Sequence, residues 1–351
     1  MKVKVLMLIY NPTSGPAFSN RKIHQVFPFL PSIDGLVRDY IDDMTRAGRG
    51  AFSFEIVERY DLDELAPATI ERLVSPEGEL LIENHQWTSR DAFFRNVSNI
   101  YGSKTGTFVD LFNNGRADYP AVINDPRFDI PHKVDAGTID MVWVLGPPGS
   151  GFWEAAMAGP GAYWVNGGPI DGIASSRRFV ILAHGYDRDV ACWLEVTAHM
   201  TENILSRVSR RWPLNRKARN RAGVETSFNE WDYFTLTETQ NYDDRIVAPG
   251  YAQVGTAHFP PNAPRDSNYA FAFTDQVTSG ADDWFTYPEL KGLRKTVNRE
   301  TWNTFNGDYH RGFLNWWFGH IPSAPGSHDG VLNNWWRYIW DVNRDPDRLE
   351  P

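Results

Sequence analysis

Glu195, His199 and Glu202 are the residues whose types and spacing most strongly suggest chemistry. At ~100° per residue along a helix, His199 lies near ~40° and Glu202 near ~−20° from Glu195, so the three side chains form one stripe. Two carboxylates beside an imidazole can hold a divalent metal ion or transfer a proton. The same stripe also fits an ordinary solvated helix face, and the sequence leaves both interpretations open.

The helix positions around these two glutamates carry no positive charge. A solvated helix face usually places Lys or Arg three or four residues from its glutamates. Glu195 and Glu202 instead have as neighbours Ala191, Cys192, Ala198, His199, Leu205 and Ser206. We therefore expect an arginine from elsewhere or a cation to compensate the carboxylates, and the small alanines leave room for a covering segment.

A third metal ligand can come from the half of the chain beyond residue 213. The segment Gly255–Asn262 places His258 on a loop that Pro260 and Pro261 stiffen. His310 and His320 are further choices. The remaining histidines, interpreted as surface residues, are His24, His85, His132, His184 and His328.

The resulting hypothesis is a zinc-type site. We expect His199, Glu202 and His258 as metal ligands and Glu195 as general base, with the roles of the two glutamates exchangeable. Two nitrogen ligands and one carboxylate with an open position suit Zn²⁺ in hydrolysis, because the ion lowers the pKa of water that it binds.

The motif His199-Met200-Thr201-Glu202 resembles the His-x-x-Glu pair with which zinc metallocarboxypeptidases hold their metal. The resemblance implies a peptide or amide substrate and covers only this motif. In that family the pair lies in a loop after a strand, whereas here it lies within an expected helix, and the family's specificity arginines have no counterpart.

Two other segments resemble a family of uncharacterised bacterial proteins. They are Gly159-Pro160-Gly161-Ala162-Tyr163-Trp164 and Asn333-Asn334-Trp335-Trp336. This resemblance implies no activity and assigns no residue roles.

The tryptophan-rich second half supports an alternative function. Eight of the 14 tryptophans lie beyond residue 230. Trp316 and Trp335, each beside asparagine, are candidate site residues of a carbohydrate-active or carbohydrate-binding protein, with acid–base groups among Asp282, Asp283 and Asp308. The same tryptophans can be helix core, and a non-catalytic structural or interaction protein is a third possibility.

Composition limits the partners and cofactors. A net charge of −9 argues against nucleic acid as a partner, although a basic run extends from Arg207 to Arg221. The single cysteine, Cys192, excludes sites built from several thiolates, so we expect only His, Asp or Glu as metal ligands. The run Gly146–Glu154 lacks the Lys-Ser/Thr of a phosphate-binding loop, and no nucleotide cofactor is expected. A small molecule, peptide or glycan is the expected substrate.

The pattern of the first 212 residues predicts an α/β fold, with a layered, mainly parallel sheet flanked by helices. The expected strands are Val3–Tyr10, Phe52–Glu58, Asp140–Leu145 and Arg178–Ala183. Residues 1–212 are expected to form this core domain. Residues 213–351 are expected to form an aromatic-rich cap or second subdomain, which can also be continuous with the first.

The helices expected between these strands are marked by their caps. Ser32 can begin one through Met44, and Asp61 or Asp63 can begin another through Leu73. Residues Ser89–Tyr101 carry a helical fragment, but the pattern does not place the stretch from Asn84 to Pro131. The helix with the stripe begins at Asp187 or Asp189 and reaches about Arg210. We interpret residues 146–172 as a rigid loop excursion.

The N-terminal apolar run is interpreted as a first strand and not as a signal peptide, because it is short and lacks a cleavage site. No run is long enough for a membrane span, so a membrane is not an expected partner. The compartment stays open, since a cleaved signal would precede the sequence given.

Overall fold

A computed structural model describes residues 1–75, 78–102, 117–152, 154–219, 225–237, 251–264 and 267–344. The chain forms two compact units. The first, here called the sheet unit, comprises Val3–Val37 and Glu55–Asp189; the second, the aromatic unit, comprises Met1–Lys2, Arg38–Phe54 and Val190–Pro351. The domain boundary expected at residue 212 stays a prediction, because compactness alone does not show which segments fold independently.

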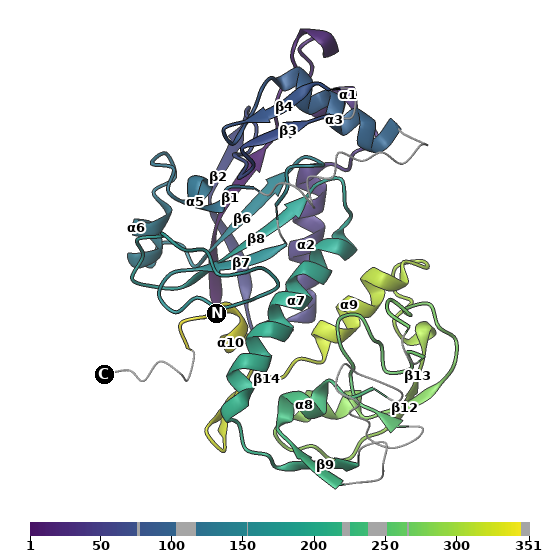
Figure 1. The fold of residues 1–351 in the computed structure, drawn as a ribbon. Helices are drawn as coiled ribbons and strands as arrows, with labels where there is room; N and C mark the ends of the chain where they lie inside the picture. The colour runs from purple at the N-terminus through teal and green to yellow at the C-terminus, as the bar shows by residue number, and fades with distance from the viewer. Residues whose placement is uncertain are drawn as a thin grey trace. The chain divides into compact units, whose positions relative to one another are not determined.

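A five-stranded sheet lies at the centre of the sheet unit, in the order β2-β1-β6-β8-β7 (Figure 1). β1 pairs with β6 and β6 with β8 in parallel, and β7 is antiparallel to β8. The bounds are β1 Lys2–Tyr10, β2 Ser53–Leu62, β6 Met141–Gly146, β7 Ala155–Ala158 and β8 Phe179–Gly185. The mainly parallel α/β sheet and the four predicted strands are thus confirmed.

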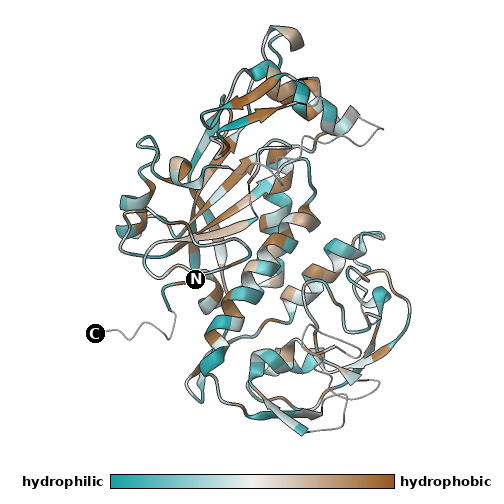
Figure 2. Ribbon diagram, viewed as in Figure 1, coloured by the Kyte–Doolittle hydropathy of each residue, from teal (hydrophilic) through white to brown (hydrophobic). Residues whose placement is uncertain are grey.

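Continuous apolar runs explain why these segments form central strands. Every residue of β6 is buried, as expected where both faces of a parallel sheet are covered. On one face Leu8, Val142 and Ile181 share a core with α5 (Tyr119–Ile123) and α6 (Ile130–Asp135). Figure 2 shows the same strands coloured as hydrophobic. The helices therefore cover the sheet through apolar contacts.

The helix predicted to begin at Asp61 or Asp63 is wrong. β2 continues to Leu62, and Leu73 lies in β3 (Arg72–Val74) of a small antiparallel sheet with β4 (Leu80–Glu83) and β5 (Gln86–Trp87). Leu73 pairs with Ile82 across this sheet, and both side chains are buried there. Partners distant from the local pattern therefore decide the conformation.

The predicted loop excursion at residues 146–172 contains strand β7, so that prediction is wrong at its centre. Ala156 pairs with Ile181 of β8. Alanine favours strands weakly, and pairing with a neighbour supplies what the local sequence lacks. β7 ends beside Gly159, whose φ is +97° and whose added Cβ would lie 2.3 Å from the Arg177 carbonyl oxygen. Only glycine fits this close approach.

The aromatic unit contains the helix predicted from Asp187 or Asp189, observed as α7 (Val190–Val208). α9 (Tyr309–Gly319) lies beside α7 (Figure 1). The helix predicted from Ser32 is α2 (Ile33–Ala47), and the helical fragment at Ser89–Tyr101 is α3 (Arg90–Gly102) of the sheet unit. Other elements are α1 (Ile23–Val26), α8 (Glu230–Phe234), α10 (Trp336–Trp340), β9 (Arg216–Arg219), β10 (Glu225–Phe228), β11 (Tyr251–Ala252), β12 (Val277–Ser279), β13 (Lys295–Val297), β14 (Ser323–His328), β15 (Val331–Asn334) and 3₁₀ turns at Pro16–Phe18, Ser209–Arg211, Ala281–Thr286 and Arg299–Thr301.

Tryptophans build the core of this unit. Trp193 of α7 stacks on Tyr40 of α2 with ring centroids 4.3 Å apart, and the Tyr40 hydroxyl lies 2.8 Å from the Thr197 hydroxyl. Trp317 and Trp335 are fully buried. Paired aromatic rings stabilise a core beyond their buried area, so the tryptophan enrichment of the second half is largely structural.

Two further features follow from the sequence. Within the basic run, Arg216 pairs with the buried Glu230 at 2.8 Å and Lys217 with Glu225 at 3.0 Å. These cations therefore neutralise carboxylates of their own unit.

Among the described residues, no helix has the length and apolar character needed to cross a bilayer.

His184 in β8 is buried, so its interpretation as a surface histidine is wrong. Its Nε2 lies 3.1 Å from the Arg188 carbonyl oxygen. Burial lowers the pKa of His184 from 6.5 to about 4, although the Arg188 carbonyl opposes this shift. The imidazole is therefore neutral in the folded protein near pH 6, where an unfolded chain begins to protonate it.

We expect His184 to lower stability as the pH falls. Between pH 6.5 and about 4 only the unfolded chain takes up this proton, so the free energy of unfolding decreases by at most about 1.4 kcal/mol per pH unit. Above pH 6.5 this group has no effect. Urea unfolding of His184→Gln at several pH values should show a weaker pH dependence than wild type. An equal reduction in His132→Gln, which alters an exposed histidine, would contradict the assignment.

Candidate metal site

The Glu195–His199–Glu202 stripe is covered and does not face water. Glu195 is 4% exposed, and His199 and Glu202 are half-buried. The covering segment includes Ala257, which is fully buried and whose backbone N–H donates to Glu202 Oε1 at 2.8 Å. Ala198, beneath this contact, is also fully buried. The small residues of α7 therefore admit the loop that carries His258, as their size suggested.

Several side chains converge on the Glu195 carboxylate. The nearest atoms to Oε1 are Tyr269 Oη at 2.6 Å, His258 Nε2 at 2.9 Å and His199 Nε2 at 3.7 Å. His310 Nε2 lies 3.3 Å from Oε2. The two carboxylate oxygens thus face different histidines, His199 and His258 on one side and His310 on the other.

The stacking of the rings fixes these histidines. The His199 and His258 rings meet edge to face with centroids 4.4 Å apart. His310, on α9, lies parallel to Phe271 at 4.8 Å. Restricted rings need little reorganisation to bind an ion, so the cluster is preorganised.

Hydrogen-bonding neighbours keep Glu195 ionised despite its burial. Burial alone raises the pKa of this carboxyl, but His199, His258, His310 and Tyr269 together lower it well below its usual range. No Lys or Arg in the described part of the chain pairs with Glu195 or Glu202. The negative charge at the centre is therefore balanced only by polarised neutral groups or by a cation.

Two overlapping groups have ligand atoms close enough to share one ion. Glu195, His199 and His258 form one group, and Cys192, Glu195 and His310 form the other; within each, the ligand atoms lie within 4.8 Å of one another. The expectation that only His, Asp or Glu could be metal ligands is too narrow, because the Cys192 thiol belongs to the second group.

Tyr269 holds an uncommon backbone conformation. Its φ is +62°, in the left-handed region that bulky residues rarely occupy. Its N–H donates to the His258 carbonyl at 3.1 Å, and its ring is 47% exposed. Backbone strain of about 1–3 kcal/mol is retained mainly where structure or function requires it. Here the left-handed backbone conformation directs the Tyr269 hydroxyl to Glu195.

The structure brings together all four residues of the predicted centre, Glu195, His199, Glu202 and His258, and it adds His310 from the further choices. It does not bring His320, Trp316 or Trp335 to this cluster. His320 lies 3.4 Å from Asp282, and Trp335 is fully buried in the aromatic core. Which of the glutamates is a ligand stays a prediction at this point.

The aspartates considered for glycoside hydrolysis have structural partners. Asp283 accepts hydrogen bonds from the N–H groups of Lys291 and Gly292, and Asp308 caps α9 through the N–H of Arg311. Sequence reasoning missed Tyr269 altogether. No local motif marks it, because its role arises from loop geometry.

Replacing Glu195 should weaken the metal-free protein. In Glu195→Gln the charge that accepts the surrounding hydrogen bonds is lost, and we expect a decrease of about 2 kcal/mol in the free energy of unfolding at pH 7. Because the folded pKa is depressed, this stabilisation is present above pH 4.5 and disappears only as the pH falls toward the folded pKa.

Urea unfolding of chelator-treated protein measures this effect. Glu225→Gln is the matched control, since it removes an exposed carboxylate paired with Lys217 and should cost at most about 1 kcal/mol. Equal losses in the two variants would contradict the described environment of Glu195.

Comparison of the chain with models of protein families, with curated proteins and with solved structures gives no match. Neither resemblance seen in the sequence is therefore established as a family relationship. The conclusion on this site is a His/Glu/Cys cluster that can hold a metal ion of unspecified identity.

Proposed function

We propose that the protein is a metal-dependent hydrolase of the zinc type that cleaves a peptide or amide bond, with Glu195, His199 and His258 holding the ion. The spacing of the ligand atoms carries this proposal. Glu195 Oε1 lies 2.9 Å from His258 Nε2 and 3.7 Å from His199 Nε2. These distances bracket the ~3.4 Å between ligands of a tetrahedral ion bound at about 2.0–2.1 Å.

Charge balance gives independent support. A buried carboxylate needs a matching positive charge, and no Lys or Arg in the described part of the chain pairs with Glu195. A divalent ion supplies the missing charge, and neutral imidazoles are then the appropriate ligands. The cluster thus has the donor types and the net charge that a zinc-type ion requires.

Glu195 is assigned as a ligand in place of the general base first expected, and Glu202 is assigned as a positioning residue in place of a ligand. Glu202 Oε2 lies 3.3 Å from His199 Nδ1, while its Oε1 accepts the Ala257 N–H. A carboxylate that receives the second N–H of a ligating histidine orients the ring and raises its basicity. Glu202 therefore acts on the ion through His199.

The remaining polar groups suit proton transfer to a substrate. When bound, a zinc-type ion polarises a carbonyl group and makes water more acidic. His310 Nε2 is buried and lies 3.3 Å from Glu195 Oε2. We assign His310 to carry the proton and the Tyr269 hydroxyl to bind substrate, because the Tyr269 ring is partly open to solvent. The peptide or amide class is the expectation stated from the sequence, and the hydrolysis assay below tests it.

Metal binding tests the ligand assignment. Wild-type protein incubated with Zn²⁺ and desalted should retain about one equivalent. His199→Ala, His258→Ala and Glu195→Ala should each lose it, whereas Glu202→Gln should bind about 10–100-fold more weakly because only the orientation of His199 is affected. Elemental analysis and calorimetric titration measure this. His328→Ala is the control and should bind as wild type does. Absence of Zn²⁺, Co²⁺ and Mn²⁺ binding by wild type would overturn the proposal.

Hydrolysis tests the activity itself. Zinc-loaded protein should release amine from a library of peptides and acyl amides, and chelation should abolish this release until Zn²⁺ is restored. His310→Ala should lower kcat by about 10²–10⁴-fold while leaving metal content unchanged, since proton transfer contributes that range. Full metal loading without turnover of any library member would contradict hydrolase function but not the metal site.

A further inference from the structure

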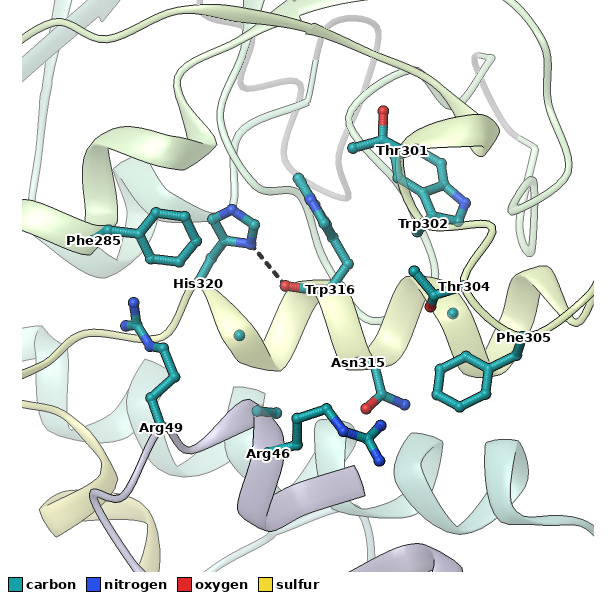
Figure 3. A pocket seen from close by; sticks show the side chains of 13 residues that line it. Arg46, Arg49, Phe285, Thr301, Trp302, Thr304, Phe305, Asn315, Trp316 and His320 are labelled. Atoms are coloured by element: carbon teal, nitrogen blue, oxygen red, sulfur yellow. Dashed lines mark hydrogen bonds between the residues drawn. The ribbon is translucent and has the colours of Figure 1, made fainter. Parts of the chain in front are cut away.

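A cavity of about 580 Å³ lies within the aromatic unit (Figure 3). The end of α2, the turn after it, two 3₁₀ segments and α9 form its walls. Its charged or titratable lining residues are Arg46, Arg49 and His320, and no carboxylate lines it. The whole chain carries a net charge of −9, so a cavity whose lining holds two arginines and no carboxylate is unusual here. Its volume is in the range of small-molecule sites.

Arg49 is the group most available to a ligand. Its Nη2 donates to the Ile321 carbonyl and to Ser323 Oγ, both at 3.3 Å, and its Cζ lies 4.6 Å from the Phe285 ring centroid. No carboxylate in the described part of the chain pairs with it. Burial lowers the pKa of Arg49, yet a guanidinium stays protonated at neutral pH.

The backbone of Arg49 is also unusual, because its φ is +47° and an arginine gains nothing from this left-handed conformation. Glycine or asparagine would adopt it at less cost. The Arg49 guanidinium points toward Phe285 in Figure 3. The conformation belongs to the turn after α2, in which the Arg49 N–H donates to the Arg46 carbonyl at 3.2 Å.

Arg46 is the second arginine of the cavity wall. Arg46 Nη1 lies 3.1 Å from Asp43 Oδ1, and Arg311 Nε lies 2.6 Å from Asp43 Oδ2. Asn315 also donates to Asp43 at 3.1 Å. Asp43 itself does not line the cavity, where Arg46 lies beside Asn315 (Figure 3).

Aromatic rings form the other side of the cavity. Trp316 lies 5.5 Å from Trp302 and 4.3 Å from His320, and Phe285 stacks on His320 at 4.5 Å, all between ring centroids. Such rings present flat apolar faces to a flat ligand. His320 is buried, and its Nδ1 lies 2.7 Å from the Trp316 carbonyl oxygen, so it holds the wall in place.

This cavity is separate from the metal site. At ~100° per residue, Asn315 and Gly319 lie about 140° and 180° around α9 from His310. The helix therefore presents His310 to the histidine cluster and the opposite face to the cavity. A Cβ added at Gly319 would meet nothing within 4 Å, so the glycine leaves this space open.

We propose that the cavity binds a small molecule in which an anionic group, carboxylate or phosphate, is attached to an aromatic ring. The anion contacts Arg49 and Arg46, and the ring packs against Trp316 and Phe285. Charge-assisted contacts from arginine and stacking on aromatic faces are both specific for this combination. The site is independent of the proposed hydrolase activity.

Tryptophan fluorescence and calorimetric titration with 1-naphthoate test the proposal, since Trp302 and Trp316 line the cavity. The neutral 1-naphthamide, the ringless acetate and inorganic phosphate, and 1-naphthyl phosphate complete the panel. Naphthoate or naphthyl phosphate should bind at least tenfold more tightly than naphthamide or the ringless anions. The tighter of the two identifies the anionic group.

Substitutions in the cavity wall test where the aromatic anion binds. Arg49→Gln should weaken naphthoate or naphthyl phosphate at least tenfold, and Gly319→Leu should abolish binding by filling the cavity. Arg38→Gln is the control, because Arg38 is an exposed arginine on α2, the helix that precedes Arg49. Arg38 pairs with Asp39 and does not line the cavity. Circular dichroism shows whether the variants remain folded.

Failure of both aromatic anions to bind up to about 10 mM would overturn the proposal. So would equal affinity for naphthamide, or an Arg49→Gln variant that binds as Arg38→Gln does. Loss of zinc binding has no bearing on these outcomes, so the two sites are tested separately.

Discussion

The burial of the Glu195 carboxylate is the constraint on which the centre of the aromatic unit depends. A charge in this position must be matched, and the described residues that contact it are imidazoles and a phenol, with no lysine or arginine among them. The loop that carries His258 covers α7, and Tyr269 has a left-handed backbone conformation. The resulting cluster of His, Glu and Cys side chains can hold a metal ion.

The two faces of helix α9 border different parts of this unit. His310 extends from one face toward Glu195, while Gly319 and Trp316 on the other face border the cavity that Arg46 and Arg49 line. Asp43, shared by Arg46 and Arg311, joins α2 to α9 at the same place. The buried tryptophans pack between these elements.

Elements marked by the pattern of a single segment could be predicted from the sequence. Strands that depend on pairing with a second segment could not. The continuous apolar runs predicted β1, β2, β6 and β8, and caps with apolar periodicity predicted α2 and α7. β3 and β7 were not predicted, because cross-strand pairing and not their own composition makes them strands. The residue types and spacing on α7, with the stiff loop of His258, suggested the metal cluster. Tyr269 could not be found, because loop geometry alone brings its hydroxyl to Glu195.

X-ray absorption of the zinc-loaded protein measures the central claim most directly, because it reports the atoms bound to the ion. The account predicts a first shell of nitrogen and oxygen at about 2.0–2.1 Å with imidazole scattering from two histidines. A shell without imidazole, or one containing sulfur at about 2.3 Å from Cys192, would contradict it.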